Sequence, residues 1–415
     1  MINSGIPWIG EIPEGWKVIS FSNGILRMGT GLNPRDNFEL SKDADLYYVT
    51  IRNFKDGKLY LDSNCDRITP EAWKMIQERS QLRKGDILYA SISKDGQAYL
   101  LEDDATTWNI NESVFCIRVN NSYFNNKYFY YHLIDAEFYK DLRIDATGTT
   151  FQSIKQNKLR MSSLCLPPLS EQEAIADFLD KKCAEIDQMV ALQEKFIDEL
   201  KAYKQSLITE TVTKGLNPNA PMKDSGVEWI GEIPEGWEIK RLRYLCKFET
   251  GNQDTQDAKP EGAYPFYVRS PLVERSDKYS FEGESILMAG DGAGAGRVFH
   301  HVYGKYAVHQ RVYRLSNFSD VESTYLYYYI SSLFQRVMDM GSAQSTVPSV
   351  RLPMLTNFVV CIPPVLEQQK NVSFLDKKCS EIDQLITIKQ KKIEEYKDYK
   401  KSLIYEYVTG KKEVI

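Results

Sequence analysis

The sequence is poor in the residues that carry metal binding and nucleophilic catalysis. Its 415 residues include only seven cysteines and four histidines, and no two cysteines form a CxxC pair. Cys165 and Cys361 lie in apolar runs, where a reduced thiol acts as a small hydrophobic side chain. His300, His301 and His309 fall in a segment that alternates like a β-hairpin and lack zinc-type spacing. We therefore expect no metal site.

Long apolar runs are also missing. No stretch approaches the 18 or more apolar residues of a membrane span, and the first residues lack the basic flank and apolar core of a signal peptide. The hydrophobic share of 42% and the charged share of 26% are typical of folded globular proteins. The length suggests two or three domains. We expect a cytoplasmic protein.

Catalytic motifs are absent as well. The glycine-rich AGDGAGAGR, residues 289–297, lacks the Lys-Ser/Thr ending of a phosphate loop, because Arg297 and Val298 follow its last glycine. The residues after it read as a strand, whereas a dinucleotide fingerprint requires a helix there. No nucleophile elbow, HExxH or zinc-deaminase pattern occurs. We assign no catalytic residue and no cofactor.

What the chain does contain is a duplication. The stretch WIGEIPEGW occurs at Trp8–Trp16 and again, letter for letter, at Trp229–Trp237. A longer match relates residues 166–213 to residues 362–409, and the segments between the two matches differ in length and sequence. The sequence is a tandem repeat with a constant frame and diverged inserts.

WIGEIPEGW reads as a compact turn held by two buried indoles, with its proline and glycine supplying the bend. Identical turns also imply identical docking surfaces in the two halves. We therefore predict partner-binding roles for Trp8, Trp16, Trp229 and Trp237.

Two long helices are expected to start after Pro168 and Pro364. Apolar residues at alternating steps of three and four predict a heptad seam in each. In the first helix they are Ile175, Leu179, Ile186, Met189, Phe196, Leu200, Tyr203 and Leu207; in the second they are Leu375, Ile382, Leu385, Ile393, Tyr396 and Leu403. Such helices need a partner, either in another molecule or in each other, and we favour pairing within the chain.

The inserts read as mixed α/β regions with aromatic, β-branched strands, each closed by an aromatic helix. The predicted fold is α+β, with two globular α/β domains and a pair of long antiparallel coiled-coil helices in a pseudo-twofold tandem repeat. The expected divisions are 1–19, a first head at 20–165, a helix at 166–215, a linker with the repeated Trp/Pro segment at 216–240, a second head at 241–361 and a helix at 362–415.

The repeated WIGEIPEGW, the segments LPPLSEQEAIADFLD and IPPVLEQQKNVSFLD, and the paired helices resemble the DNA-specificity subunit of type I restriction-modification systems. The resemblance covers the architecture of the whole chain. It implies that each head is a target recognition domain for one half of a split sequence in double-stranded DNA. It also implies that the helices form an antiparallel coil that spaces the heads, that two methyltransferase subunits bind the constant segments, that restriction subunits join them, and that this subunit has no catalytic activity.

Candidate DNA contacts lie in polar loops, where Arg can fork onto guanine and Asn or Gln onto adenine. They are Arg52, Ser91, Ser93, Lys94, Asn109 and Asn111 in the first head, and Arg269, Arg297, His309, Gln310 and Arg311 in the second. Hydroxyls and basic groups suited to phosphates are Thr149, Thr150, Lys155, Ser345 and Arg351, although helix capping also explains the hydroxyls. The family often has a proline where the first half has Gln152; the second half has Pro348.

The net charge of −5 and the near-balanced charge of both heads do not favour tight phosphate binding by this chain alone. A coiled-coil scaffold with two protein- or glycan-binding heads is the alternative. An enzyme in its own right comes third, because it would require a cofactor site that the sequence does not show. Salt-sensitive duplex binding by an assembled complex separates the first two.

Overall fold

The computed structural model describes residues 1–35, 37–55, 57–93, 96–143, 153–341 and 348–414. The chain forms two compact units. The first comprises Met1–Gln193 and Lys391–Ile415, and the second comprises Glu194–Gln390. Each unit therefore contains one head and a part of both long helices.

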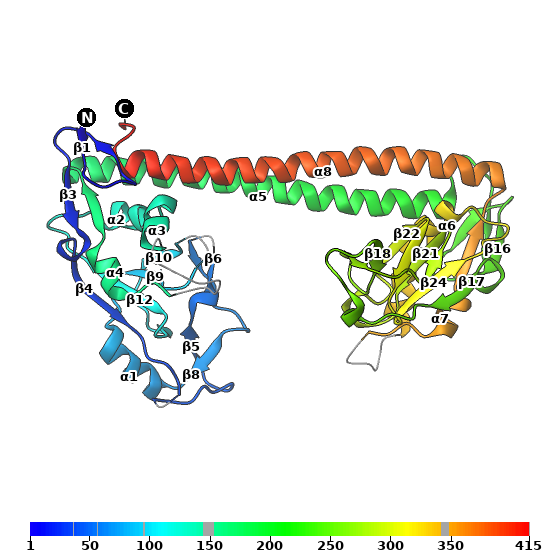
Figure 1. The fold of residues 1–415 in the computed structure, drawn as a ribbon, viewed down its shortest axis with the longest axis horizontal. Coiled ribbons are helices and arrows are strands. Elements are labelled where there is room, and N and C mark those ends of the chain that lie inside the picture. Colours follow the sequence, from blue (N-terminus) through cyan, green and yellow to red (C-terminus); the bar gives the residue numbers. More distant parts are fainter. Residues whose placement is uncertain (36, 56, 94–95, 144–152, 342–347, 415) are drawn as a thin grey trace. The chain divides into compact units, whose positions relative to one another are not determined.

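The first unit contains a four-stranded antiparallel sheet of order β10-β9-β12-β4 and a three-stranded sheet of order β11-β5-β8 (Figure 1). Within the second sheet, β5 and β11 run parallel. The strands of this unit are β1 (Ile2–Asn3), β2 (Glu11–Ile12), β3 (Lys17–Ser20), β4 (Ile25–Thr30), β5 (Leu46–Val49), β6 (Phe54–Lys55), β7 (Lys58–Leu59), β8 (Asp66–Ile68), β9 (Ile87–Ala90), β10 (Ala98–Leu100), β11 (Trp108–Ile110), β12 (Val114–Val119) and β13 (Ser163–Leu166).

Local signals explain the helices of the first head. In α1 (Pro70–Ser80) the Thr69 side chain accepts the Ala72 N–H, and the helix ends at Gln81 in the left-handed region. The aromatic segment predicted as one helix is two, α2 (Asn126–Leu133) and α3 (Ala136–Arg143). The break lies at Asp135, whose carboxylate accepts the Phe138 N–H at 2.8 Å, so a capping side chain ends one helix and starts the next. A short α4 (Gln156–Met161) precedes β13.

The second unit repeats this plan. Its sheets have the orders β17-β24-β21-β22 and β19-β18-β23-β20, and β18 runs parallel to β23 as β5 does to β11. Helices α6 (Ser323–Gly341) and α7 (Leu352–Thr356) follow the sheets. The strands are β14 (Met222–Asp224), β15 (Glu232–Pro234), β16 (Glu238–Arg241), β17 (Lys247–Thr250), β18 (Tyr264–Tyr267), β19 (Val273–Ser276), β20 (Phe281–Glu282), β21 (Ser285–Ala289), β22 (Phe299–Val302), β23 (Lys305–Val308), β24 (Val312–Ser316) and β25 (Val359–Ile362). The glycine-rich segment joins β21 to β22, so a strand follows it, as the sequence predicts.

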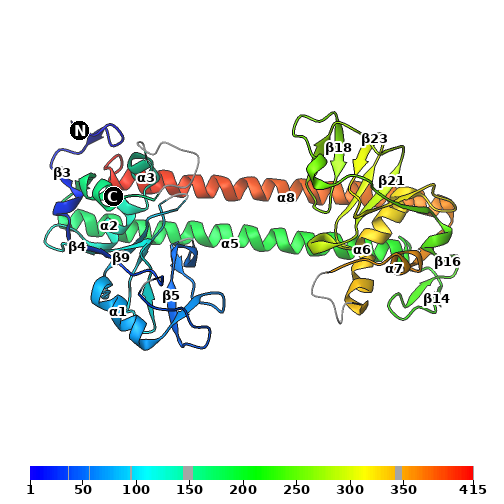
Figure 2. The same ribbon diagram turned by 60° about the horizontal axis from the view of Figure 1, so that its bottom comes forward.

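The two long helices are α5 (Leu169–Lys214) and α8 (Val365–Val408), and they begin directly after the two proline pairs as predicted. Both units pair them antiparallel (Figures 1 and 2). In the first unit, Lys400 binds Asp187 at 2.7 Å and the Phe178 and Tyr407 rings lie 4.5 Å apart. In the second unit, Lys204 binds Asp383 at 2.7 Å and Lys389 lies over the Phe196 ring. Within the described residues, no helix has both the length and the apolar content needed to cross a membrane.

The predicted heptad spacing of the long helices is correct, but some of the residues assigned to the buried seam lie on the exposed side of the helix. Ile175, Leu179, Ile186, Leu375, Ile382, Ile393 and Leu403 are buried as expected, but Met189, Phe196, Tyr203 and Leu385 are exposed. Positions such as Cys183 and Ile197 are buried instead. Both stripes repeat at heptad spacing, so the period alone could not decide which stripe faces the partner helix. The stripe that contains Met189, Phe196 and Tyr203 remains on the surface.

Each head binds the last turn of the helix from the other repeat. In the first unit, the Tyr128 hydroxyl donates to the Cys165 and Val408 carbonyl oxygens; in the second, the Tyr325 hydroxyl donates to those of Cys361 and Val212. Both tyrosines are fully buried. These bonds join the first domain to β13 and the end of α8, and the second domain to β25 and the end of α5, in the same way, which confirms the pseudo-twofold repeat.

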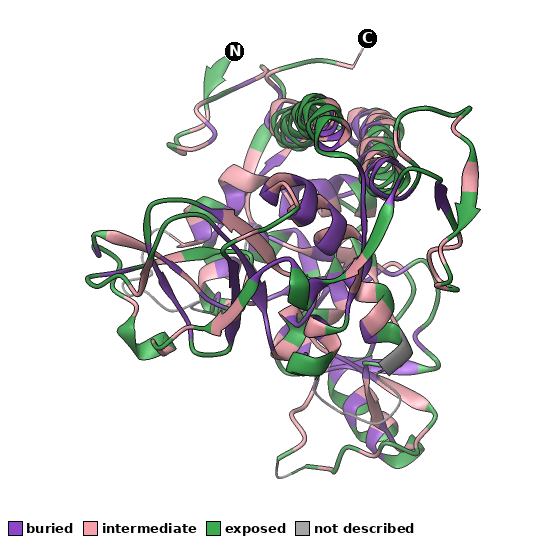
Figure 3. Ribbon diagram, turned by 90° about the vertical axis from the view of Figure 1, so that its right-hand side faces the viewer, coloured by how far each residue is buried: buried purple, intermediate pink, exposed green. Residues whose placement is uncertain are grey.

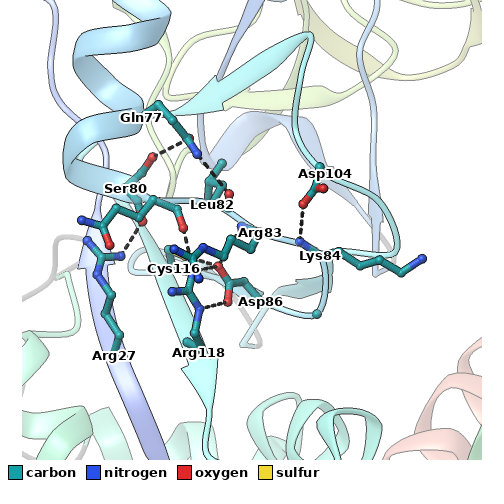
Figure 4. Close-up of polar contacts among 12 residues, drawn as sticks. Arg27, Gln77, Ser80, Leu82, Arg83, Lys84, Asp86, Asp104, Cys116 and Arg118 are labelled. Atoms are coloured by element: carbon teal, nitrogen blue, oxygen red, sulfur yellow. Dashed lines mark hydrogen bonds and ion pairs between the residues drawn. The ribbon is translucent and has the colours of Figure 1, made fainter.

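A buried ion pair stabilises the first head (Figure 4). Arg118 on β12 donates through Nε and Nη2 to both oxygens of Asp86 at 2.8 Å, and the Arg83 N–H binds the same carboxylate at 3.0 Å. The Asp86 side chain is 2% exposed and that of Arg118 is 20% exposed. The hydrogen bonds to Asp86 raise the pKa of Arg118. The pair joins β12 to the loop that leads into β9.

We expect Asp86→Ala to lower the free energy of unfolding of the first unit by about 3 kcal/mol, because it leaves the mostly buried Arg118 without its counter-charge. Urea titration of the purified chain measures this loss. Asp103→Ala is the matched control, since its pair with Lys84 is exposed and should contribute less than about 1 kcal/mol. Equal effects of the two substitutions would contradict the assignment.

Candidate nucleic-acid interface

In both heads, four loops meet where the parallel strand pair ends. The Asn111 N–H donates to the Val49 carbonyl at 2.9 Å, and the His309 N–H donates to the Tyr267 carbonyl at 3.0 Å. We call these meeting points the head corners. They comprise residues 50–52, 91–93, 111–113 and 153–155 in the first head and residues 268–270, 290–292, 309–311 and 349–351 in the second.

Two further backbone contacts fix the equivalence of the corners. The Ser91 N–H binds the Ser113 carbonyl, as the Gly290 N–H binds that of Arg311, each at 2.9 Å. The Ile154 N–H then binds the Ser91 carbonyl, and the Val350 N–H binds that of Gly290, each at 2.8 Å. The sequence-predicted candidates in these loops are therefore brought together within each head, and the loops that carry them occupy matching positions in the two heads.

A glycine backs each corner. A Cβ on Gly31 would lie 1.7 Å from the Ile110 carbonyl oxygen, and one on Gly251 would lie 2.0 Å from that of Val308. Any side chain at either position would push the corner loop away, because both neighbours are backbone atoms. Tight backbone packing therefore holds the corners in place.

The second corner carries an ion-pair network. Arg269 donates to one oxygen of Asp291 at 3.0 Å, and Arg311 donates to the other at 2.6 Å. Gln310 donates through Nε2 to Asp254 at 2.7 Å. The ring of His309 is 2% exposed; its Nδ1 accepts the Arg311 N–H, and its Nε2 lies 3.4 Å from Asp254. Arg269, Gln310 and Arg311 thus present outward from a fixed base, whereas His309 is part of that base.

Both carboxylates of this network are held ionised. Burial raises the pKa of Asp291, but hydrogen bonds and charge from Arg311 and Arg269 outweigh it, so the pKa lies below its ordinary value. A backbone hydrogen bond from Thr255, with the nearby His309, lowers the pKa of Asp254. The hydrogen bond to Asp291 raises the pKa of Arg311. The network keeps these charges at neutral pH.

The first corner is less charged. Arg52 is exposed and binds Asp66 at 3.1 Å. The Asn111 side chain accepts the Ser113 N–H, and Ser93 Oγ accepts the Gly96 N–H. These three polar groups lie at or beside the surface of the corner.

Two predicted contacts of the first head are corrected. Asn109 is fully buried, where its amide donates to Gln77 and accepts the Ser80 hydroxyl proton, so its polar groups bind inside the domain. Ser91 is 2% exposed and holds the corner through its backbone. Neither side chain reaches a surface where a base edge could be contacted.

The remaining candidates are spread around the corners. Lys155 and Arg351 are exposed and occupy equivalent positions before α4 and α7. Arg297 is exposed and donates to Gln335 at 2.9 Å, outside the ion-pair network. Four candidates, Lys94, Thr149, Thr150 and Ser345, lie outside the described residues.

The repeat also appears in comparison with known proteins. The family model of the type I restriction modification DNA specificity domain matches residues 13–202 and again residues 234–398. The chain belongs to this family. The putative type I restriction enzyme MjaX specificity subunit of Methanocaldococcus jannaschii is 26% identical, over 97% of this chain and 95% of the relative. The MjaVIII specificity subunit of the same organism is 22% identical, over 97% and 94%.

Among solved structures, one described as the structural basis of complex assembly and conformational transition of the type I R-M system has a TM-score of 0.68. The alignment covers 96% of this chain and 98% of that chain, at 16% identity. At this identity the likeness concerns the fold. Together with the family match, it identifies the two heads as the DNA recognition domains of a specificity subunit.

The tryptophans of this specificity subunit serve mainly inside the fold. Trp16 and Trp237 are buried, and Trp16 donates through Nε1 to Glu171 at 3.1 Å. Trp8 packs on His132 and Phe138, and Trp229 stacks on Phe358. These contacts fit the turn held by indoles, and they leave only the half-buried Trp8 and Trp229 partly available to a partner.

Sequence reasoning missed the two carboxylates beneath the second corner. Asp254 begins the capping box of a short 3₁₀ helix, and Asp291 lies in the glycine-rich segment, whose composition suggests a nucleotide loop more than a DNA contact. Acidic residues are not expected in a DNA-contacting loop, so only the structure brings them under the arginines. Among the described residues, no group of three or more His, Cys, Asp and Glu side chains is placed to hold a metal.

Proposed function

We propose that the chain is a non-catalytic subunit that recognises a bipartite DNA sequence, with one head reading each half of the target. The long helices set the gap between the half-sites and bind two methyltransferase subunits, and restriction subunits join this core. In this proposal the partner subunits carry out methyl transfer and cleavage.

The observation that carries the proposal is a corner whose backbone bonds repeat in both heads while its side chains differ. Backbone bonds make Arg269, Asp291 and Arg311 equivalent to Ile51, Ile92 and Ser113 of the first head. A duplicated scaffold that served one ligand twice would keep these side chains alike. Two different half-sites need the same loops in the same place with different donors and acceptors.

Matching apolar surfaces support two partner sites. The exposed stripe gives the first unit Met189, Leu192 and Tyr399, and gives the second unit Leu385, Ile388 and Tyr203. Each of these six side chains is between 46% and 59% exposed. In Figure 3 the long helices, seen end-on, are largely exposed. One apolar surface presented twice suits two copies of the same partner.

A groove in the second unit adjoins this surface. It has a volume of about 840 Å³ and lies between α6 and the long helices, with Tyr327, Tyr328, Lys204, Asp383 and Ile388 among its lining residues. Tyr328 donates to Asp376 at 2.7 Å, so the groove combines apolar walls with fixed polar groups. That combination suits a protein partner.

Duplex binding by the assembled complex tests the proposal. We expect the purified chain alone to bind DNA weakly, because its charge is close to balanced, and to gain sequence-specific, salt-sensitive affinity with its cognate methyltransferase subunit. Fluorescence anisotropy over a range of salt concentrations measures both states. Tight specific binding by the chain alone would contradict the partner requirement, and no duplex binding by the complex would favour the scaffold alternative.

A pair of variants tests the docking surfaces in the same assay. Met189→Glu with Leu385→Glu should abolish the gain from the partner, because each charge interrupts one apolar surface. Leu26→Glu is the control, since Leu26 is even more exposed but lies on β4. Circular dichroism should show unchanged helix content in both, and equal partner binding by both would exclude these surfaces.

A further inference from the structure

The second head corner has a pair of arginines held by one carboxylate. Asp291 is largely buried, with its side chain 15% exposed, whereas those of Arg269 and Arg311 are 42% and 63% exposed. The carboxylate is therefore at the base of the corner, and the two guanidinium groups extend from it toward solvent.

The base of this arrangement is rigid. Asp291 forms a β-bridge with Ser349, and the backbone bonds of Gly290 with Val350 and of Gly292 with Pro348 flank it at 2.8 and 3.0 Å. The loop of Arg311 is fixed in turn by its N–H bond to His309. A side chain anchored at both its backbone and its guanidinium loses little further freedom on binding.

Anchoring leaves most donors available. The recorded bonds to Asp291 engage Nη1 of each arginine, and a guanidinium has five N–H groups in a planar fork. The remaining groups of Arg311 can still form the paired donors that match O6 and N7 of guanine. Lysine could not replace it, because an ammonium group has no fork.

The local charge argues against a phosphate site at these two arginines. Asp254 and Asp291 balance Arg269 and Arg311, so the exposed Arg351 is the positive charge of the corner that these two carboxylates leave unbalanced. A carboxylate that binds an arginine fixes the orientation of its guanidinium group. Hydrogen bonds to a base edge require a fixed orientation of the donor.

We propose that Arg311 reads a guanine in the half-site of the second head, and that Asp291, sharing its carboxylate with Arg269, is the positioning residue that aims it. The assignment rests on the proposed function. It specifies guanine as one recognised base, and Arg311 and Asp291 as the residues that recognise it. The first head has Ile51, Ile92 and Ser113 at these positions, so this mode of guanine recognition belongs to one half-site only.

The test uses the complex of the full chain with its methyltransferase subunits. Genome-wide methylation first gives the wild-type target, and competition binding then measures discrimination at every base pair of both halves. We expect Arg311→Gln to reduce discrimination about tenfold to a hundredfold at one G·C pair of the second half, with the first half unchanged. Asp291→Asn should weaken discrimination at the same pair less, because the arginine remains but is no longer aimed.

Arg243→Gln is the matched control, since Arg243 is an exposed arginine of the same unit that binds Asn357 away from the corner. It should leave discrimination unchanged, and thermal unfolding should show that all three variants fold. Retained discrimination in Arg311→Gln, or an equal loss on every sequence with a smaller salt dependence, would overturn the assignment. A wild-type complex without sequence preference would instead refute the proposed function.

Discussion

Exchanging residues 245–358 for the corresponding segment of a relative should change one half of the methylated sequence and leave the other half intact. The joints lie at equivalent, well-anchored points. The Leu242 N–H donates to the Phe358 carbonyl at 2.8 Å, and β16 pairs with β25 directly outside the exchanged segment. The long helices and the β16–β25 pair therefore remain native, and the exchanged segment carries the corner, its sheets, α6 and α7.

Methylation mapping in a host genome measures the outcome. The matched control exchanges residues 24–162, because the Phe21 N–H donates to the Ser162 carbonyl at 2.8 Å and β3 pairs with β13, as at the second joint. That exchange should change the opposite half-site. If either exchange altered both halves together in a complex that still methylates, the heads would not read DNA independently.

The frame of the fold could be predicted from sequence because its signals are local or repeated. Prolines before α5 and α8 mark both helix starts, and apolar β-branched runs mark β9, β12, β21 and β24. The break between α2 and α3 was missed, since the capping carboxylate of Asp135 lies in a segment whose aromatic residues continue at helical spacing. A sequence shows the helical spacing of its apolar residues, but it does not show that one buried capping side chain ends the helix within that spacing.

The candidate site was predicted only in part, for a related reason. Composition points to polar loop residues, and this located Arg269, Gln310 and Arg311. Burial depends on which strands pair, so nothing in the sequence separates the buried Asn109 from the corner residue Asn111 two positions later. The role of Asp291 depends on residues far apart in the chain, which only the folded corner brings together.

The helix seam shows the same limit and has a functional consequence. Met189, Tyr203 and Leu385 fit a heptad as well as the buried residues do, because an exposed apolar stripe beside a coiled-coil seam has the same period. An apolar stripe left on the surface of a highly charged helix calls for a partner. The misassigned residues are thus the ones that support the proposed docking surfaces.

Adding one heptad to both long helices should abolish methylation of the original target, or transfer it to a target with a different gap. The insertion points are after Gln193 and after Lys389, which are equivalent positions in the repeat. Seven residues lengthen each helix by about 10 Å, which corresponds to about three base pairs of DNA. The seam itself stays nearly in phase, since seven residues complete almost two turns.

Rotation makes the effect large. Three base pairs turn the far half-site by roughly 100°, because B-DNA has about 10.5 base pairs per turn, and a nearly in-phase heptad does not rotate the protein to match. Methylation mapping should therefore find either a changed gap or none of the original sites. The control places the same seven residues in the linker after Asn217, which lengthens the chain without lengthening a helix and should keep the original target. Unchanged methylation of that target by a variant whose circular dichroism shows both added heptads to be helical would exclude the helices as the element that sets the gap.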